Sequence, residues 1–199
     1  DGSTVQTSAE IEKLYKYANS NGIALHLDGA RIWNAHVASG ISFREFGKYF
    51  ETLSVCLSKG LGAPIGSLMI SNKNRVNEAR IWRKRYGAGM RQVGIIAAAN
   101  IGRLAEDHNQ AKRLAEACAA IDLSFVNPER VETNIVGLNL EKSKFSAGEF
   151  AAEAKSEGVW IGALGPKFVR LVTHMDLDNY AIDKAIEVLQ KLLKRSLVA

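Results

Sequence analysis

The chain has 199 residues, of which 47% are hydrophobic and 24% are charged, and its formal net charge is +5 at pH 7. This length and composition are typical of a soluble globular protein with one large or two small domains. The apolar runs are all shorter than the roughly 18 residues that a membrane-spanning helix needs, and the basic residues are spread over several segments, so we expect neither a membrane nor a nucleic acid as a partner.

The first part of the chain predicts strands that alternate with helices. A helix begins at Ser8, which is a suitable N-cap, and ends at Gly22. The buried strand IALHLD follows and ends at Asp28, and two short helices then lead to a second buried strand, TLSVCL, which runs up to Ser58. Two strands joined by helices form a parallel crossover, in which both strands end at the same edge of a sheet.

The remainder of the chain predicts a change from one kind of domain to another. After a glycine-rich loop we expect a strand (SLMISN), a basic helix over residues 72–87 and a long helix over about 91–121. From Asp122 onward, short strands and helices follow in an order that suits a small α+β domain. The expected domains are residues 1–121, a portion of a larger α/β domain, and residues 122–199. Because the chain opens with a helix and lacks an initiating methionine, we expect it to be a portion of a longer protein.

A single lysine, Lys59, stands at the start of the glycine-rich loop, directly after the second strand. The spacing of Gly60, Gly62 and Gly66 is close to a dinucleotide-binding fingerprint, but Pro64 and a strand follow where that motif needs a helix. A Walker phosphate loop does not fit either, because its lysine follows the glycines. Two interpretations of Lys59 remain: a solvated loop residue, or an amine that forms a covalent bond with an aldehyde.

Asp28 occupies the corresponding place at the end of the first strand. Both side chains are therefore expected at one edge of a parallel sheet, where ligands of open α/β sheets bind. An aspartate at this position can simply cap the next helix. Paired with a reactive lysine, it can instead hold the pyridine nitrogen of pyridoxal 5'-phosphate in its protonated form. A lysine that is partly removed from water and close to other cations loses its proton more readily and becomes a nucleophile.

The cysteines and histidines carry less information. Cys56 and Cys118 lie in apolar segments without the spacing of a zinc site or a disulfide framework. This predicts buried, reduced thiols in a cytoplasmic protein and no bound metal. His26 is expected in the core of the first strand or stacked near the sheet edge, and none of the histidines can be given a catalytic role.

Four motifs, in this order, resemble the threonine aldolase family of pyridoxal-phosphate enzymes: HLDGARIWNA, CLSKGLGAPIGSLMI, RIWRKRYGAGMRQ and VRLVTHMDLD. The resemblance runs through essentially the whole chain. It implies an α/β fold of the aspartate-aminotransferase type, with a C-terminal portion of the cofactor-binding large domain followed by the small domain. It also implies a cytoplasmic lyase of amino-acid metabolism that uses pyridoxal 5'-phosphate to cleave L-threonine or L-allo-threonine to glycine and acetaldehyde. The family motifs that grip the phosphate and supply a proton-handling histidine are expected in an N-terminal part, on the same or on a separate chain.

The resemblance further implies roles for individual residues. Lys59 is the lysine linked to the cofactor aldehyde, Asp28 binds the pyridine nitrogen, and Ser58 adds a hydroxyl near the phosphate. Arg31 lies beside the cofactor and helps to bind the substrate carboxylate, for which the two-pronged guanidinium of Arg170 is the main clamp. An Arg31 on the surface of a helix and an Arg170 that is only an edge-strand charge remain alternatives.

Lys84 and Arg91 resemble residues that reach across a subunit interface, Lys84 toward a neighbour's substrate and Arg91 toward its cofactor. They imply a homo-oligomer, a dimer or a tetramer, with shared active sites, although basic residues in such a segment can also be merely solvated. Two other functions stay open. One is a different pyridoxal-phosphate lyase that acts by β-elimination, and the other is a non-catalytic fragment without the phosphate-binding part.

Overall fold

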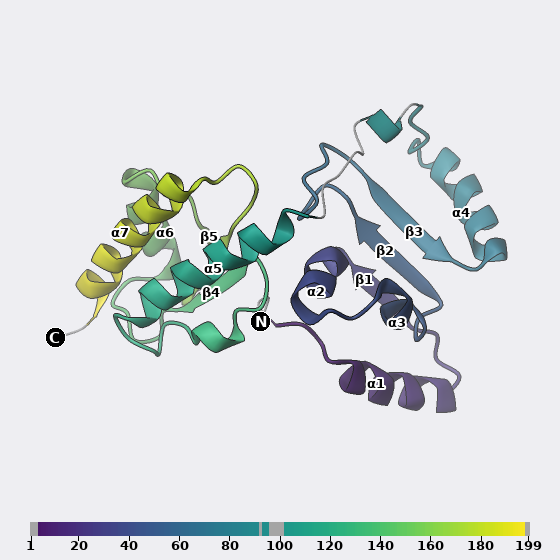
Figure 1. Cartoon of the computed structure of the whole chain (residues 1–199), viewed down its shortest axis with the longest axis horizontal. Coiled ribbons are helices and arrows are strands. Elements are labelled where there is room, and N and C mark those ends of the chain that lie inside the picture. Colours follow the sequence, from purple (N-terminus) through teal and green to yellow (C-terminus); the bar gives the residue numbers. More distant parts are fainter. Residues whose placement is uncertain (1–3, 92, 96–101, 198–199) are drawn as a thin grey trace. The chain divides into compact units, whose positions relative to one another are not determined.

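The computed structural model describes residues 4–91, 93–95 and 102–197 of the chain (Figure 1). Its internal contacts divide the chain into two compact units. The N-terminal unit holds Gln6–Gly102, and the C-terminal unit holds the residues from Arg103 onward together with the segment up to Val5. None of the helices that the structure describes is both long enough and apolar enough to span a membrane.

The N-terminal unit is built around a three-stranded sheet with the order β1-β2-β3. Its elements are α1 (Ser8–Ser20), β1 (His26–Gly29), α2 (Ile32–Ser39), α3 (Phe43–Gly47), β2 (Thr52–Cys56), β3 (Ser67–Ser71), α4 (Lys73–Arg85) and the 3-10 helix η1 (Val93–Ile95). β1 pairs with β2 in parallel, and β3 pairs with β2 antiparallel. The predicted parallel crossover is confirmed: α2 and α3 connect two parallel neighbours (Figure 1).

The sheet of the N-terminal unit has a polar face and an apolar face. The paired positions on the polar face are His26, Asp28, Thr52, Ser54, Cys56, Ser67, Met69 and Ser71. The paired positions on the apolar face are Leu27, Gly29, Leu53, Val55, Leu68 and Ile70. Helices α2 and α3 lie over the apolar face and enclose, with β3, a groove of about 580 Å³.

The predicted burial of these strands is wrong in part. In β2 only Leu53 and Val55 are buried, and the alternating residues on the polar face, Cys56 among them, are half-buried. In β1 the polar-face residues His26 and Asp28 are exposed, so His26 is not a core residue; its Nδ1 lies 2.8 Å from Thr52 Oγ1. The alternation of residue types in TLSVC matches a strand with one buried face, which is what forms.

Helix α1 has its N-cap one residue before the predicted one, so that Ser8 is its first helical residue. The cap is Thr7 rather than Ser8, because Thr7 and Glu10 form a capping box in which each side chain accepts a hydrogen bond from the other's backbone N–H. Ile11 and Ala18 are the buried residues of this helix. Beyond its end, Gly22 adopts a left-handed conformation with φ of 66°, which confirms it as the stop signal.

The long helix predicted over residues 91–121 is wrong at its start. Arg91 lies in a turn, a short 3-10 helix covers Val93–Ile95, and α5 begins only at Leu104. Glycine is unfavourable inside a helix, and Gly94 and Gly102 both lie in the stretch that the prediction treated as helical. The rest of that stretch, residues 92 and 96–101, lies outside the described residues.

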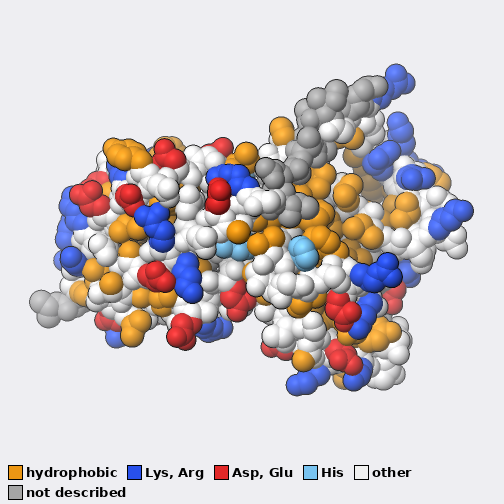
Figure 2. Space-filling model, in the orientation of Figure 1, with side chains coloured by type: hydrophobic (Ala, Val, Ile, Leu, Met, Phe, Trp, Pro, Cys, Tyr) orange, Lys and Arg blue, Asp and Glu red, His pale blue; other side chains and the backbone are white. Residues whose placement is uncertain are grey.

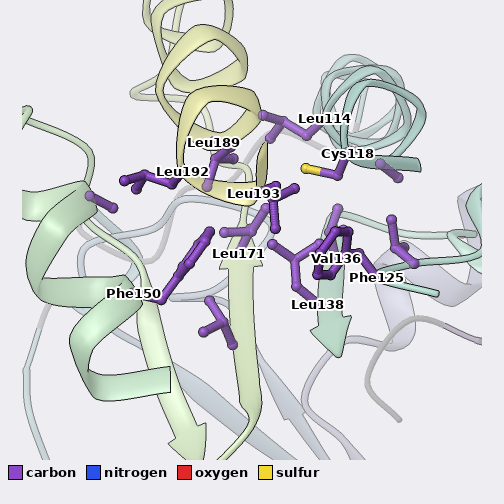
Figure 3. Packing of buried hydrophobic residues seen from close by; sticks show 14 of the residues in the cluster. Leu114, Cys118, Phe125, Val136, Leu138, Phe150, Leu171, Leu189, Leu192 and Leu193 are labelled. Carbon is purple, nitrogen blue, oxygen red and sulfur yellow. The ribbon is translucent and has the colours of Figure 1, made fainter. Parts of the chain in front are cut away.

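The C-terminal unit confirms the predicted α+β pattern. Its elements are α5 (Leu104–Ala119), the 3-10 helix η2 (Pro128–Arg130), β4 (Ile135–Asn139), α6 (Ala147–Ser156), β5 (Gly162–Gly165), β6 (Phe168–Val172) and α7 (Asn179–Ser196). The sheet is antiparallel with the order β4-β6-β5, so β6 is its central strand. Side chains from α5, α6 and α7 pack with Val136, Leu138 and Leu171 into one core on a single face of this sheet (Figure 3).

Helix α5 belongs to this core, since Leu114 and Cys118 pack in it and Leu104 is fully buried. The compact unit therefore begins at Arg103, before the Asp122 at which we expect the small domain to begin. At the other end of the chain, the backbone N–H of Val5 donates to a carboxylate oxygen of Glu132 at 2.6 Å, which ties the first residues to this unit.

A buried carboxyl on α5 makes the stability of the C-terminal unit depend on pH. Asp107 is 1% exposed, and its Oδ1 lies 3.8 Å from Nη1 of Arg103. Burial raises the pKa of Asp107 above its usual value, although the charges of Arg103 and His174 oppose this. A carboxyl whose folded-state pKa is raised stabilises the fold at pH values below its unfolded pKa, and this contribution is lost as the pH rises through the folded pKa.

We therefore expect Asp107→Asn to remove the part of the decline in unfolding free energy that sets in as the pH rises above the ordinary aspartate pKa of about 4. Asparagine keeps the shape of the side chain but does not have to give up a proton in the core. Urea denaturation at a series of pH values measures the slope, and Glu187→Gln, at an exposed position of α7, is the control. Equal slopes for the parent and Asp107→Asn would contradict the assignment.

Candidate active site

The carboxyl end of β1 carries the first predicted site residue, Asp28. Its side chain is exposed on the polar face, and its Oδ1 accepts a hydrogen bond from the backbone N–H of Ala30 at 3.0 Å. The next residue must be small, because a Cβ added to Gly29 would lie 2.8 Å from the backbone oxygen of Ser54. The backbone contact with β2 and the hydrogen bond to Ala30 thus fix the main chain around Asp28, while one carboxylate oxygen remains available to a ligand.

Lys59 lies in a compact loop that follows β2. Backbone hydrogen bonds close this loop: Leu57 N–H donates to Gly66 O at 2.9 Å, and Gly62 N–H donates to Lys59 O at 2.9 Å. Gly62 has φ of 69°, in the left-handed region that favours glycine. Gly62 therefore suits the turn, and the turn holds the backbone of Lys59 while its side chain stays exposed.

The pairing of β1 and β2 brings these residues to one edge. In the parallel register Asp28 is opposite Ser54, so the segment that leaves β2 with Ser58 and Lys59 emerges at the same edge as Asp28. Arg31 occupies the N-cap position of α2 at this edge and is half-buried. The structure thus brings together an amine, a carboxylate, a hydroxyl and a guanidinium at the carboxyl ends of adjacent parallel strands, which is where α/β sheets bind ligands.

Arg170 belongs to the C-terminal unit, on the central strand β6. It lies on the sheet face opposite the core, between Gly137 of β4 and Gly162 of β5 in the strand register. Its side chain is exposed, and among the described residues its guanidinium has no hydrogen bond or ion pair. The alternative of an edge-strand charge is wrong, because β6 is paired on both sides.

Comparison with known proteins decides the family. A model of the family described as beta-eliminating lyase matches residues 1–141. The chain belongs to the beta-eliminating lyase family. It is 35% identical over 190 residues to a probable low-specificity L-threonine aldolase 2 of Arabidopsis thaliana, covering 92% of this chain and 54% of that protein. To the low specificity L-threonine aldolase of Escherichia coli K12 it is 38% identical over 177 residues, covering 85% of this chain and 51% of that protein.

Solved structures agree with this beta-eliminating lyase assignment. A putative L-allo-threonine aldolase from Listeria monocytogenes is similar with a TM-score of 0.73 and 25% identity, over 94% of this chain and 57% of that one. An aspartate aminotransferase from Thermotoga maritima shares the fold, with a TM-score of 0.73 and 15% identity, over 96% of this chain and 53% of that one. The predicted fold class is confirmed. The chain spans about half the length of the curated relatives that it matches.

Two further predicted site residues of this family member lie beyond β3. Lys84 is in the last turn of α4, which carries basic side chains along its length (Figure 2). The Lys84 side chain lies against the following loop, since a Cβ added to Gly89 would be 2.9 Å from Nζ. Arg91 is exposed in the turn after that loop. The structure leaves their roles across a subunit interface as predictions.

The residues at the β1–β2 edge fit the cofactor that the family fold implies. Pyridoxal 5'-phosphate offers an aldehyde, a basic ring nitrogen and a phosphate. At this edge the amine of Lys59 suits the aldehyde, the carboxylate of Asp28 suits the ring nitrogen, and the hydroxyl of Ser58 suits the phosphate. Among the described residues, no cluster of three or more histidine, cysteine or acidic side chains could hold a metal ion.

A contact that the sequence patterns do not indicate joins α2 to the end of β2. The indole Nε1 of Trp33 donates to the backbone oxygen of Cys56 at 3.0 Å, just before the loop that carries Lys59. Trp33 is thus a structural support of the site, because it fixes the helix that carries Arg31 against the strand that precedes Lys59. The motif HLDGARIW placed Trp33 close to Arg31 in sequence, but no pattern shows which backbone oxygen an indole will reach.

The thiol of Cys56 lies at the same edge, where Ser58 and Lys59 influence its pKa. Its Sγ lies 3.3 Å from Ser58 Oγ. Burial acts to raise the pKa of Cys56, but hydrogen bonds with Ser58 and the positive charge of Lys59 outweigh it, so the pKa is lowered. Cys118 differs: it is fully buried among apolar residues, and burial raises its pKa to about 12.

We expect a disulfide reagent at pH 8 to label Cys56 at least about tenfold faster than Cys118, because only the thiolate reacts and only Cys56 is accessible. If Lys59 binds pyridoxal 5'-phosphate, loading the protein with this cofactor should slow the labelling of Cys56. Peptide mapping of the labelled protein identifies the residue, and labelling of Cys118 in denaturant is the control. Equal labelling rates of Cys56 and Cys118 in the folded protein would contradict the lowered pKa and the accessibility of the Cys56 thiol.

Proposed function

We propose that the protein is a pyridoxal-phosphate-dependent threonine aldolase, which cleaves L-threonine or L-allo-threonine to glycine and acetaldehyde. One observation carries the proposal: the amine of Lys59 and the carboxylate of Asp28 emerge at the same edge of two adjacent parallel strands. The similar proteins named as threonine aldolases support the choice of substrate. A carbon–carbon lyase of β-hydroxy-α-amino acids is therefore the activity that fits both the edge and its relatives.

In this proposal the residues of the chain bind and orient. When bound, the cofactor supplies an electron sink for the pair of electrons released from the broken bond. Lys59 provides the amine that holds the cofactor aldehyde and gives way to the substrate amine. Asp28 keeps the ring nitrogen protonated by the attraction between opposite charges.

Arg31 and Arg170 hold the substrate carboxylate, each with a planar pair of N–H donors. By fixing the carboxylate, the arginines would orient the bond between Cα and Cβ for cleavage, and a bound cofactor would take up the electrons of that bond. They thereby set the choice of reaction as well as the affinity.

We also propose a homo-oligomer, a dimer or a tetramer, in which Lys84 and Arg91 reach a neighbour's active site. Both residues are exposed and belong to a segment rich in positive charge, which suits a neighbour's anionic cofactor or substrate. An N-terminal part, on the same or a separate chain, would complete the phosphate site. The free thiols of Cys56 and Cys118 fit a reducing compartment such as the cytoplasm.

Product analysis tests the proposed activity. The complete protein, loaded with pyridoxal 5'-phosphate, is supplied with L-threonine or L-allo-threonine, and glycine and acetaldehyde are measured; D-threonine is the control substrate. We expect equal amounts of the two products. Ammonia and a keto acid as the main products would replace the aldolase with a β-eliminating lyase, and no turnover of either substrate would contradict both.

A further inference from the structure

At the position of Arg170, neither neighbouring strand of the sheet presents a side chain. Residues directly opposite one another on paired strands normally touch through their side chains. Opposite Arg170, both partners are glycines, Gly137 and Gly162. At Gly162 an added Cβ would meet only the backbone oxygen of Arg170, at 3.6 Å, so the space there is open. At Gly137 the ring of Phe168 fills the corresponding space, with Cζ 2.7 Å from the position of a Cβ.

The carboxyl end of β6, just after Arg170, is anchored by a buried threonine. Thr173 is 1% exposed, and its hydroxyl donates to the backbone oxygen of Asp107, on α5, at 2.6 Å. Its backbone N–H donates to Asn134 O at 3.0 Å. The Asn134 side chain adds a second hydrogen bond, in which its Nδ2 donates to Thr173 O at 2.7 Å. The end of β6 is therefore tied both to the start of β4 and to the first turns of α5.

We propose that Thr173 is a positioning residue for Arg170, and that the Thr173–Asn134–Asp107 anchor sets the direction in which the guanidinium meets the substrate carboxylate. This rests on the proposed function, in which Arg170 clamps that carboxylate. The apolar residues Val169 and Leu171 already decide which face of β6 is buried. The ladder between β6 and β4 ends at the Ile135–Val172 pair, and just beyond it the hydrogen bonds of Thr173 fix the direction of the strand end.

The test compares isosteric variants of buried threonines. Thr173→Val removes the hydroxyl and keeps the shape, and Thr173→Ser keeps the hydroxyl. Thr133→Val is the matched control, because the Thr133 hydroxyl is also buried but has no hydrogen-bond partner among the described residues. Arg170→Ala serves as the reference for loss of the clamp. Calorimetry measures the binding of glycine and of ethanolamine, the same amine without a carboxylate, to the complete cofactor-loaded protein.

We expect Thr173→Val to weaken glycine binding about tenfold and to leave ethanolamine binding within about twofold of the parent, a difference of roughly 1.4 kcal/mol at the carboxylate alone. Thr173→Ser should restore most of the affinity for glycine, and Thr133→Val should match the parent. A merely structural role for Thr173 would weaken both ligands equally, or would weaken glycine in Thr133→Val as well.

The outcomes separate this inference from the proposed function. If Arg170→Ala weakens glycine binding but Thr173→Val does not, the positioning role is wrong and the clamp stands. If Arg170→Ala leaves glycine binding unchanged, or the parent does not bind glycine, the proposed role of Arg170 is wrong and the positioning role fails with it.

Discussion

Replacing Lys59 with alanine is expected to abolish the aldolase activity, lowering kcat by roughly three powers of ten or more, as loss of a covalent catalytic group commonly does. The loop that carries Lys59 is closed by backbone hydrogen bonds, so the fold should tolerate the change. Borohydride reduction of the cofactor-loaded parent, followed by peptide mapping, should place the cofactor label on Lys59. The variant should carry no label.

A second variant separates the interpretations of this lysine. Lys59→Arg keeps the positive charge, so it would preserve binding if the residue only attracted the cofactor phosphate. A guanidinium does not lose its proton at ordinary pH and cannot act as the amine nucleophile. We therefore expect Lys59→Arg to be as inactive as Lys59→Ala, with Lys13→Ala, an exposed change on α1, fully active. An active Lys59→Arg would contradict the covalent role.

The order of strands and helices at the site edge could be predicted from the sequence, for a physical reason. TLSVCL is a short apolar run and IALHLD precedes a helical pattern, so both strand ends and the crossover follow from local patterns. Parallel pairing then carries Asp28 and the Ser58–Lys59 segment to one edge. Only chain connectivity is needed for that inference.

Burial and side-chain partners could not be predicted in the same way. The apolar strand β3 exposes Leu68 and Ile70 by 48% and 45%, although their residue types favour burial. A local pattern reports what a side chain prefers, but its cover comes from distant segments of the fold. The same limit applies to Trp33, whose partner is the backbone oxygen of Cys56, and to the anchor on Thr173, whose partners lie on α5 and just before β4.

The helix prediction over residues 91–121 failed for a different reason. Its apolar and alanine-rich composition favours a helix, and α5 does form over Leu104–Ala119. The three-residue 3-10 helix at Val93–Ile95 contains Gly94, and Gly102 precedes α5. Glycine costs a helix about 1 kcal/mol relative to alanine. The two glycines in the first half of the stretch therefore disfavour a helix there, but the prediction gave more weight to the apolar, alanine-rich composition.

Asp28→Asn is expected to lower kcat by about two to three powers of ten while leaving the thermal unfolding temperature close to that of the parent. The two possible roles of Asp28 respond differently to this change. As a turn residue it needs only the oxygen that accepts from Ala30 N–H, and an asparagine side chain supplies the same acceptor. As the partner of a protonated ring nitrogen it needs the negative charge, and asparagine removes it.

The size of the effect follows from the charge interaction that is lost. Two unit charges 4 Å apart near a protein surface attract by about 4 kcal/mol, and each 1.36 kcal/mol lost from the transition state slows the reaction about tenfold. Asp28→Ala measures the contribution of the turn, because it also removes the acceptor for Ala30 N–H. It should therefore lower stability in addition to activity. Asp28→Asn with full activity would assign Asp28 to the turn alone, and the pairing of this carboxylate with Lys59 would then no longer support an aldolase.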